Sequence, residues 1–147
     1  MAVELSRRSV STAILSLAGC APARQQKVQP IEPSTTSYAQ AWLIEGPSRL
    51  LFISGQTPTD ANGNAPGDFA AQARLAWANI LSQLRRANMQ FADLAKVTIY
   101  LSDRRFREEN TLIRAELLGS ATPAITVVIA GIFDEAWLLE IEAIACN

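Results

Sequence analysis

Apolar residues recur at helical spacing in the middle of the chain. From Phe69 to Ala87 they are separated by four, four, three, four and three residues, which predicts one amphipathic helix of about five turns. Asp68 stands where an N-cap is needed, so the helix should begin there and end near Ala87. The predicted apolar stripe consists of Phe69, Ala73, Trp77, Ile80, Leu84 and Ala87.

A second, shorter helix is predicted from Ser102 or Asp103 to about Leu118, where Gly119 and then Pro123 end the pattern. Its stripe consists of Phe106, Asn110, Ile113 and Leu117. Asn110 is the polar member of this stripe. A buried amide needs hydrogen-bond partners, so Asn110 should either contact a ligand or bond to a neighbouring backbone.

Short apolar or alternating runs flanked by turn-forming residues predict the strands. The segments 38–44 and 50–54, joined through Gly46 and Pro47, are expected to form a hairpin. The order β-β-β-α-β-α-β-β indicates an α+β fold, a mixed sheet with both helices on one face. The predicted strands are residues 27–31, 38–44, 50–54, 96–101, 125–130 and 137–145.

Composition narrows the chemistry that such a domain can perform. The chain has 147 residues, a net charge of −1, no histidine and two cysteines, Cys20 and Cys146, far apart. A basic nucleic-acid surface, a metal site and a histidine proton shuttle are therefore not expected, and no cofactor is implied. Catalysis would have to use carboxylates, hydroxyls, amides, lysine, arginine or the backbone.

Residues 1–25 are interpreted as an export-like segment that precedes the domain at residues 26–147. Arg7 and Arg8 are followed by a weakly apolar run, as in a twin-arginine signal, and Leu17 to Cys20 form a lipobox-like pattern. A misassigned start or a plain N-terminal tail is the alternative. The expected location is exported, periplasmic or lipid-anchored at Cys20, with a cytoplasmic protein as the alternative.

Three local patterns, taken in order and with their spacing, carry a family resemblance. They are Ser54-Gly55-Gln56, residues 96–103 (KVTIYLSD) and residues 140–145 (EIEAIA), with AQAR at 71–74 between the first two. Together they resemble the Rid family of enamine/imine deaminases. The resemblance implies a chorismate mutase-like fold, a homotrimer with ligand clefts between subunits, and hydrolysis of reactive enamines or imines with release of ammonia.

A trimer also has a physical rationale. Two helices on one face leave the other face of the sheet bare, and an apolar bare face requires a partner. The residues available to fill that role are Val97, Ile99, Val128 and Ile141, although the sequence does not say which face each of them takes.

The sequence departs from the family pattern at one position. Catalytic members carry an arginine after Pro-Ala, whereas here Thr122-Pro123-Ala124 is followed by Ile125. A guanidinium grips a carboxylate through two parallel hydrogen bonds, and isoleucine makes none. We therefore expect weak deamination of 2-imino acids and a more apolar cleft. Nothing in the sequence directs Arg104, Arg105 or Arg107 into it.

The resemblance also supplies candidate site residues. Glu142 matches a glutamate that holds the attacking water, and a carboxylate in a partly dry cleft can act as acid or base. A structural hydrogen bond between subunits explains Glu142 equally well. The expected substrate-binding residues are Tyr38, Ser54, Gly55, Asn110, Ile125 and Val127. Ordinary strand, turn or core packing is the alternative for each of them.

Two functions remain open from the sequence. The first is a divergent Rid-like hydrolase that acts on a small enamine, imine or related C–N substrate. The second is a non-catalytic trimer that keeps the cleft and works as a ligand sensor or complex partner.

The export-like segment gives a first testable prediction. Removing residues 1–24 should leave the melting temperature nearly unchanged, because a tail outside the domain buries little surface. A large drop in a thermal-unfolding experiment would show that the segment is structural. If Cys20 is lipidated, the full-length protein should partition into membranes and Cys20→Ser should not.

Overall fold

The computed structural model describes residues 27–33, 38–46 and 49–147. The export-like segment and Cys20 lie outside these residues. Six strands and two helices follow in the predicted order, with short 3-10 turns at Phe91–Asp93 and Arg104–Phe106. The elements are β1 (Lys27–Pro33), β2 (Ala39–Glu45), β3 (Leu50–Gln56), α1 (Phe69–Arg86), β4 (Leu94–Leu101), α2 (Arg107–Leu118), β5 (Ala124–Ile129) and β6 (Leu139–Cys146).

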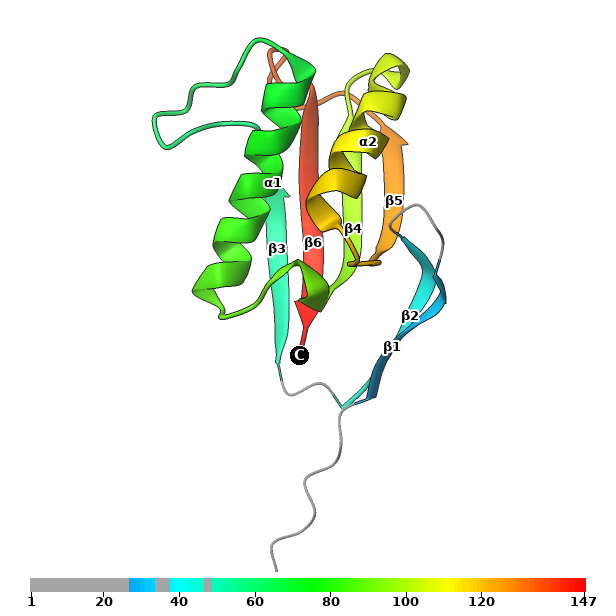
Figure 1. Ribbon diagram of the computed structural model, residues 1–147. Helices are drawn as coiled ribbons and strands as arrows, with labels where there is room; N and C mark the ends of the chain where they lie inside the picture. The colour runs from blue at the N-terminus through cyan, green and yellow to red at the C-terminus, as the bar shows by residue number, and fades with distance from the viewer. Residues whose placement is uncertain (1–26, 34–37, 47–48) are drawn as a thin grey trace, which may run out of the picture.

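The strands form one mixed sheet in the order β1-β2-β5-β4-β6-β3, and both helices cover the same face of it (Figure 1). β4 lies at the centre, parallel to β5 and antiparallel to β6, and β3 is the edge strand beside β6. At the other end, β2 joins the sheet through a single pair, Ala39 with Ala124. The predicted α+β architecture is therefore confirmed.

The predicted hairpin between segments 38–44 and 50–54 is wrong. β2 pairs with β1, whereas β3 pairs with β6. The difference follows from burial. Ile53 of β3 lies opposite Ala143 in the core, while most of β2 is exposed. Long-range burial against β6 therefore determines the partner of β3, and the short connection to β2 does not.

The helices form where their capping and apolar positions predict. The carboxylate of Asp68 accepts a hydrogen bond from the Ala71 backbone N–H at 2.9 Å, and Ala73, Trp77 and Ile80 are buried against the sheet. α2 starts later than predicted. The side chain of Asp103 caps a 3-10 turn instead, and the α-helix begins only at Arg107.

Alternation along β4 and β6 separates the two faces of the sheet. Val97, Ile99 and Ile141 are fully buried beneath the helices, so they are not available to cover the bare face. The bare face, called here the open face, carries the alternate residues of the strands. Its members on β3, β4, β5 and β6 are Phe52, Ser54, Lys96, Thr98, Tyr100, Thr126, Val128, Glu140, Glu142 and Ile144.

A buried glutamine ties α1 to the segment that leads into β6. The Gln72 amide nitrogen donates to the carbonyls of Pro66 at 2.7 Å and Ala136 at 2.9 Å, and its oxygen accepts from Leu138 N–H at 2.7 Å. Because Gln72 is only 1% exposed, water cannot replace these bonds.

We expect Gln72→Leu to lower the free energy of unfolding by about 2–4 kcal/mol, since it leaves three backbone groups unpaired. Gln83→Leu, on the half-exposed side of α1, is the matched control and should change the free energy of unfolding little. Chemical denaturation of both variants measures the difference. Equal stabilities would show that the three bonds contribute nothing to the fold.

Candidate functional site

The predicted site residues fall into two groups on opposite faces of the sheet. Ser54 and Glu142 belong to the open face, with Gly55 at the end of β3 beside them. Asn110 and Val127 lie on the helix side, with Tyr38 at the start of β2, and all three line one cleft. One protomer therefore does not bring the two groups together.

Glu142 is the centre of a polar cluster on the open face. It lies opposite Thr98 on β4, and the hydroxyl of Tyr100 donates to its Oε1 at 3.2 Å. Lys96 lies nearby and donates to the hydroxyl of Thr126. A hollow of about 120 Å³ between β3, β4 and β6 includes Lys96, Thr98 and Glu142 in its lining.

The charges of this cluster influence one another. Burial lowers the pKa of Lys96, while the negative charge of Glu142 opposes that change. For Tyr100, burial raises the pKa and the neighbouring Glu142 raises it further. Tyr100 therefore remains a protonated donor beside the carboxylate, and Lys96 supplies a positive charge close by.

Glu140 is a second carboxylate of this face, and it lies close to Gly55. A Cβ placed on Gly55 would lie 1.7 Å from Glu140 Oε1, so only glycine leaves space for this carboxylate as it stands. Only Glu142 was predicted as a site residue, although Glu140 shares its face of the strand. The close approach of Glu140 to Gly55 is visible only in the structure.

The helix-side cleft lies between α2 and β5 and has a volume of about 530 Å³. Val127 and Ile129 form its β5 wall. Ile125 is on the same face of β5 but packs against the hydrophobic core and is not part of the lining. The cleft is lined by Tyr38, Leu101, Arg104, Arg107, Asn110, Thr111, Arg114, Val127 and Ile129.

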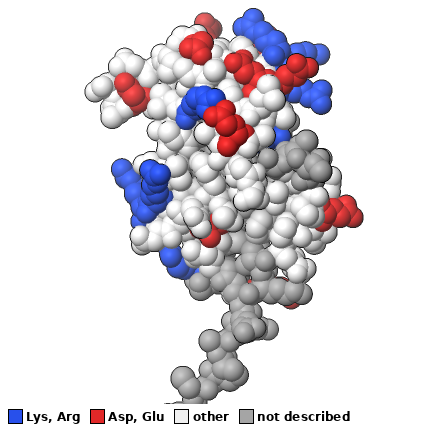
Figure 2. Space-filling view, viewed as in Figure 1, with Lys and Arg blue, Asp and Glu red and all other residues white. Residues whose placement is uncertain are grey.

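Three arginines of the cleft come from α2 and the turn before it. Arg107, Asn110 and Arg114 are separated by three and four residues, so they share one side of the helix. No arginine was expected in the cleft, but Arg104, Arg107 and Arg114 line it. Figure 2 shows the basic side chains that gather near the start of α2, next to acidic ones.

Asn110 resolves one of the two alternatives that the sequence left open. It is 1% exposed, and neither its Oδ1 nor its Nδ2 has a hydrogen-bond partner among the described residues. No backbone group of the described part of the chain therefore satisfies this amide. Its free donor and acceptor favour contact with a ligand or with another subunit.

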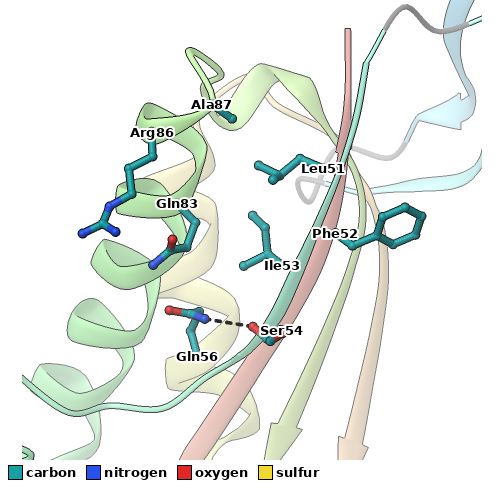
Figure 3. Close-up of a pocket in the computed structure, with 8 residues that line it drawn as sticks. All are labelled: Leu51, Phe52, Ile53, Ser54, Gln56, Gln83, Arg86 and Ala87. Atoms are coloured by element: carbon teal, nitrogen blue, oxygen red, sulfur yellow. Dashed lines mark hydrogen bonds between the residues drawn. The ribbon is translucent and has the colours of Figure 1, made fainter.

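A further groove of about 450 Å³ lies between the edge strand β3 and α1 (Figure 3). Leu51 and Ile53 point toward α1, whereas Phe52 points away from it. The Ser54 carbonyl accepts a hydrogen bond from the Gln56 side chain at 3.0 Å. The lining of this groove contains no carboxylate, so the groove lacks the acid or base that water addition needs.

Other candidate chemistry is limited within the described residues. Cys146 is buried, and burial raises the pKa of its thiol, which disfavours the nucleophilic thiolate. No group of three or more His, Cys, Asp or Glu in the described part of the chain could hold a metal ion. Within the same residues, no helix is long and apolar enough to cross a membrane.

Known proteins resemble this chain in sequence. The family described as Endoribonuclease L-PSP matches residues 12–147. A RutC family protein of Pyrococcus horikoshii is 36% identical over 98 residues, 65% of this chain and 78% of that protein. A 2-iminobutanoate/2-iminopropanoate deaminase of Bos taurus is 33% identical over 111 residues, 74% of this chain and 78% of the deaminase.

Solved structures share the fold. A member of the conserved Rid protein family from Yersinia pestis superposes with a TM-score of 0.69 at 25% identity, covering 83% of this chain and 98% of that one. A YjgF/YER057c/UK114 family member from Mycobacterium tuberculosis has a TM-score of 0.61 at 29% identity, covering 75% and 86%. With its sheet, its two helices and a match over nearly the whole chain, this protein belongs to the Rid family.

Proposed function

We propose that the protein is a Rid-type hydrolase that adds water to a small enamine or imine, in a site formed between subunits. The observation that carries the proposal is the pair of half-sites. The open face holds carboxylates beside Gly55, and the helix-side cleft holds an unsatisfied buried amide. The hollow beside Glu142 has a volume of only about 120 Å³, whereas the helix-side cleft of about 530 Å³ has no carboxylate in its lining. A relative named as an imine deaminase supports the same class of reaction.

The proposed reaction needs only carboxylate chemistry. A glutamate accepts a proton from water as the water oxygen bonds to the imine carbon, and it returns this proton to the nitrogen, which gives a carbinolamine. The carbinolamine hydroxyl then gives up its proton, which passes through the glutamate to the nitrogen. The C–N bond breaks, ammonia leaves, and a carbonyl compound remains. Glu142 has the Tyr100 hydroxyl as a donor beside it, whereas Glu140 lies against the Gly55 backbone. Either carboxylate can take the proton.

A non-catalytic ligand-binding trimer is the second candidate. The observation that favours it is the composition of β5, whose six residues include Ile125 and Val127 and no arginine. If an arginine on this strand normally holds the substrate carboxylate, the absence of that arginine would abolish turnover and leave a cleft that still binds a ligand. Activity measurements separate the two functions, because only the hydrolase releases ammonia.

Assembly into a homotrimer would unite the half-sites, and the open face is suited to be its interface. Phe52 is 72% exposed and projects from this face, and Val128 and Ile144 lie on it as well. Polar groups between them, including Thr98 and Glu142, would find partners across the interface.

We expect the protein to sediment as a trimer at micromolar concentration, and Phe52→Asp to shift it toward monomers because it places a charge in an apolar contact. Phe133→Asp is the matched control, since Phe133 is also exposed but lies in the loop before β6. Analytical ultracentrifugation measures both. A monomeric wild type would contradict the proposed assembly.

The hydrolase proposal is tested with imines generated freshly from amino acids, with ammonia release as the readout. We expect the double variant with Glu140→Gln and Glu142→Gln to lower kcat by roughly 100-fold or more, because neither amide can accept the proton. Glu135→Gln, in the exposed loop before β6, should leave kcat unchanged. If the wild type accelerates no imine or enamine in the panel, the non-catalytic trimer is the better description.

A further inference from the structure

Arg114 is a buried cation without an ion-pair partner among the described residues. It is 6% exposed, and its Nε is a buried donor without a hydrogen-bond acceptor among the described residues. Burial lowers its pKa, and among the described residues only the Tyr38 side chain, which lines the same cleft, opposes this change. A buried guanidinium without a counter-charge destabilises a fold, so its presence calls for an anion that the described part of the chain does not supply.

The surroundings of Arg114 favour an anion from solution. Arg104 and Arg107 line the same cleft, and none of its lining residues is an aspartate or glutamate. Both of these arginines are exposed, so they lie toward the solvent end, where positive charge attracts anions. Asn110, one helical turn before Arg114, adds a buried amide whose nitrogen is an unpaired donor.

The opposite wall of the cleft is apolar. Leu101, Val127 and Ile129 come from two neighbouring strands and face the arginine side of α2. A site with a buried guanidinium on one side and aliphatic side chains on the other suits a small monoanion with a hydrocarbon body. The cleft volume of about 530 Å³ is in the range of small-molecule sites.

We propose that Arg114, assisted by Asn110 and Arg107, binds the carboxylate of a small amphipathic monocarboxylate whose hydrocarbon part rests on Val127 and Ile129. The guanidinium thus comes from α2, and the carboxylate lies against the helix, whereas the arginine expected from the family pattern would stand on β5. The proposal rests on the proposed function in placing the substrate in this cleft. It places the carboxylate-binding group of this cleft on α2, whereas the sequence led us to expect a more apolar cleft because of Ile125.

Binding to the full-length protein tests the proposal without turnover. Isothermal titration would compare butanoate and benzoate with their neutral counterparts, butanamide and benzamide, and with inorganic phosphate. We expect both carboxylates to bind and both amides to bind at least about tenfold more weakly, because the charge-assisted hydrogen bonds are lost. Amides that bind as well as the acids, or phosphate binding without carboxylate binding, would overturn the proposal.

Substitutions at Arg114 identify the residue responsible. Arg114→Met should weaken carboxylate binding at least about tenfold, while Arg85→Met, an exposed arginine of α1, should leave it unchanged. Without ligand, Arg114→Met should melt at the wild-type temperature or higher, since it removes an unpaired buried charge. Arg114→Lys keeps the charge and loses the planar fork, so it should also bind more weakly.

Arg114→Lys provides a second test of the same side chain. If Arg114→Met does not fold, Arg114→Lys decides, and wild-type affinity in that variant would overturn the proposal. Carboxylate binding without ammonia release from any imine would support this subsite and reject the hydrolase. Ammonia release from imines with no measurable carboxylate binding would support the hydrolase and reject this subsite.

Discussion

The alternation of β4 and β6 at the centre of the sheet is the constraint on which the rest of the structure depends. Each strand turns alternate side chains toward the helices, where Val97, Ile99, Leu139 and Ile141 are fully buried. A shift of one residue in either strand would place these apolar groups on the open face and the carboxylates in the core. The register that builds the core therefore also builds the row of polar groups that contains Glu140 and Glu142.

The same regularity explains which parts of the fold could be predicted from the sequence. Apolar spacing in α1 and alternation in β4 are local patterns, and each was recognised because burial imposes it. The partner of β3 could not be read locally, since pairing with β6 depends on residues about ninety positions away along the chain. The start of α2 moved to Arg107 because Asp103 can cap a 3-10 turn as well as an α-helix.

The site was less accessible to sequence reasoning than the fold. Tyr38, Asn110 and Val127 do line one cleft, whereas Ile125, the position at which the chain departs from the family pattern, packs on the core. Arg114 was not predicted, because an arginine beside an apolar stripe is normally solvated, and its burial depends on tertiary packing that a local sequence pattern does not reveal. Glu140 was missed because the close approach of Gly55 is a contact between strands distant in sequence.

The groups that the structure leaves unsatisfied share a consequence. Each buried polar atom without a partner, such as those of Asn110 and Arg114, lowers the stability of the free protomer. A ligand or subunit that supplies the missing partners binds the folded state alone and so raises its stability. The stability that these unpaired atoms cost the free protomer is then recovered on binding. Affinity therefore depends strongly on whether the ligand supplies the missing hydrogen bonds and charge. An anion that satisfies Arg114 gains this energy, and a neutral molecule of the same shape must leave the guanidinium unpaired.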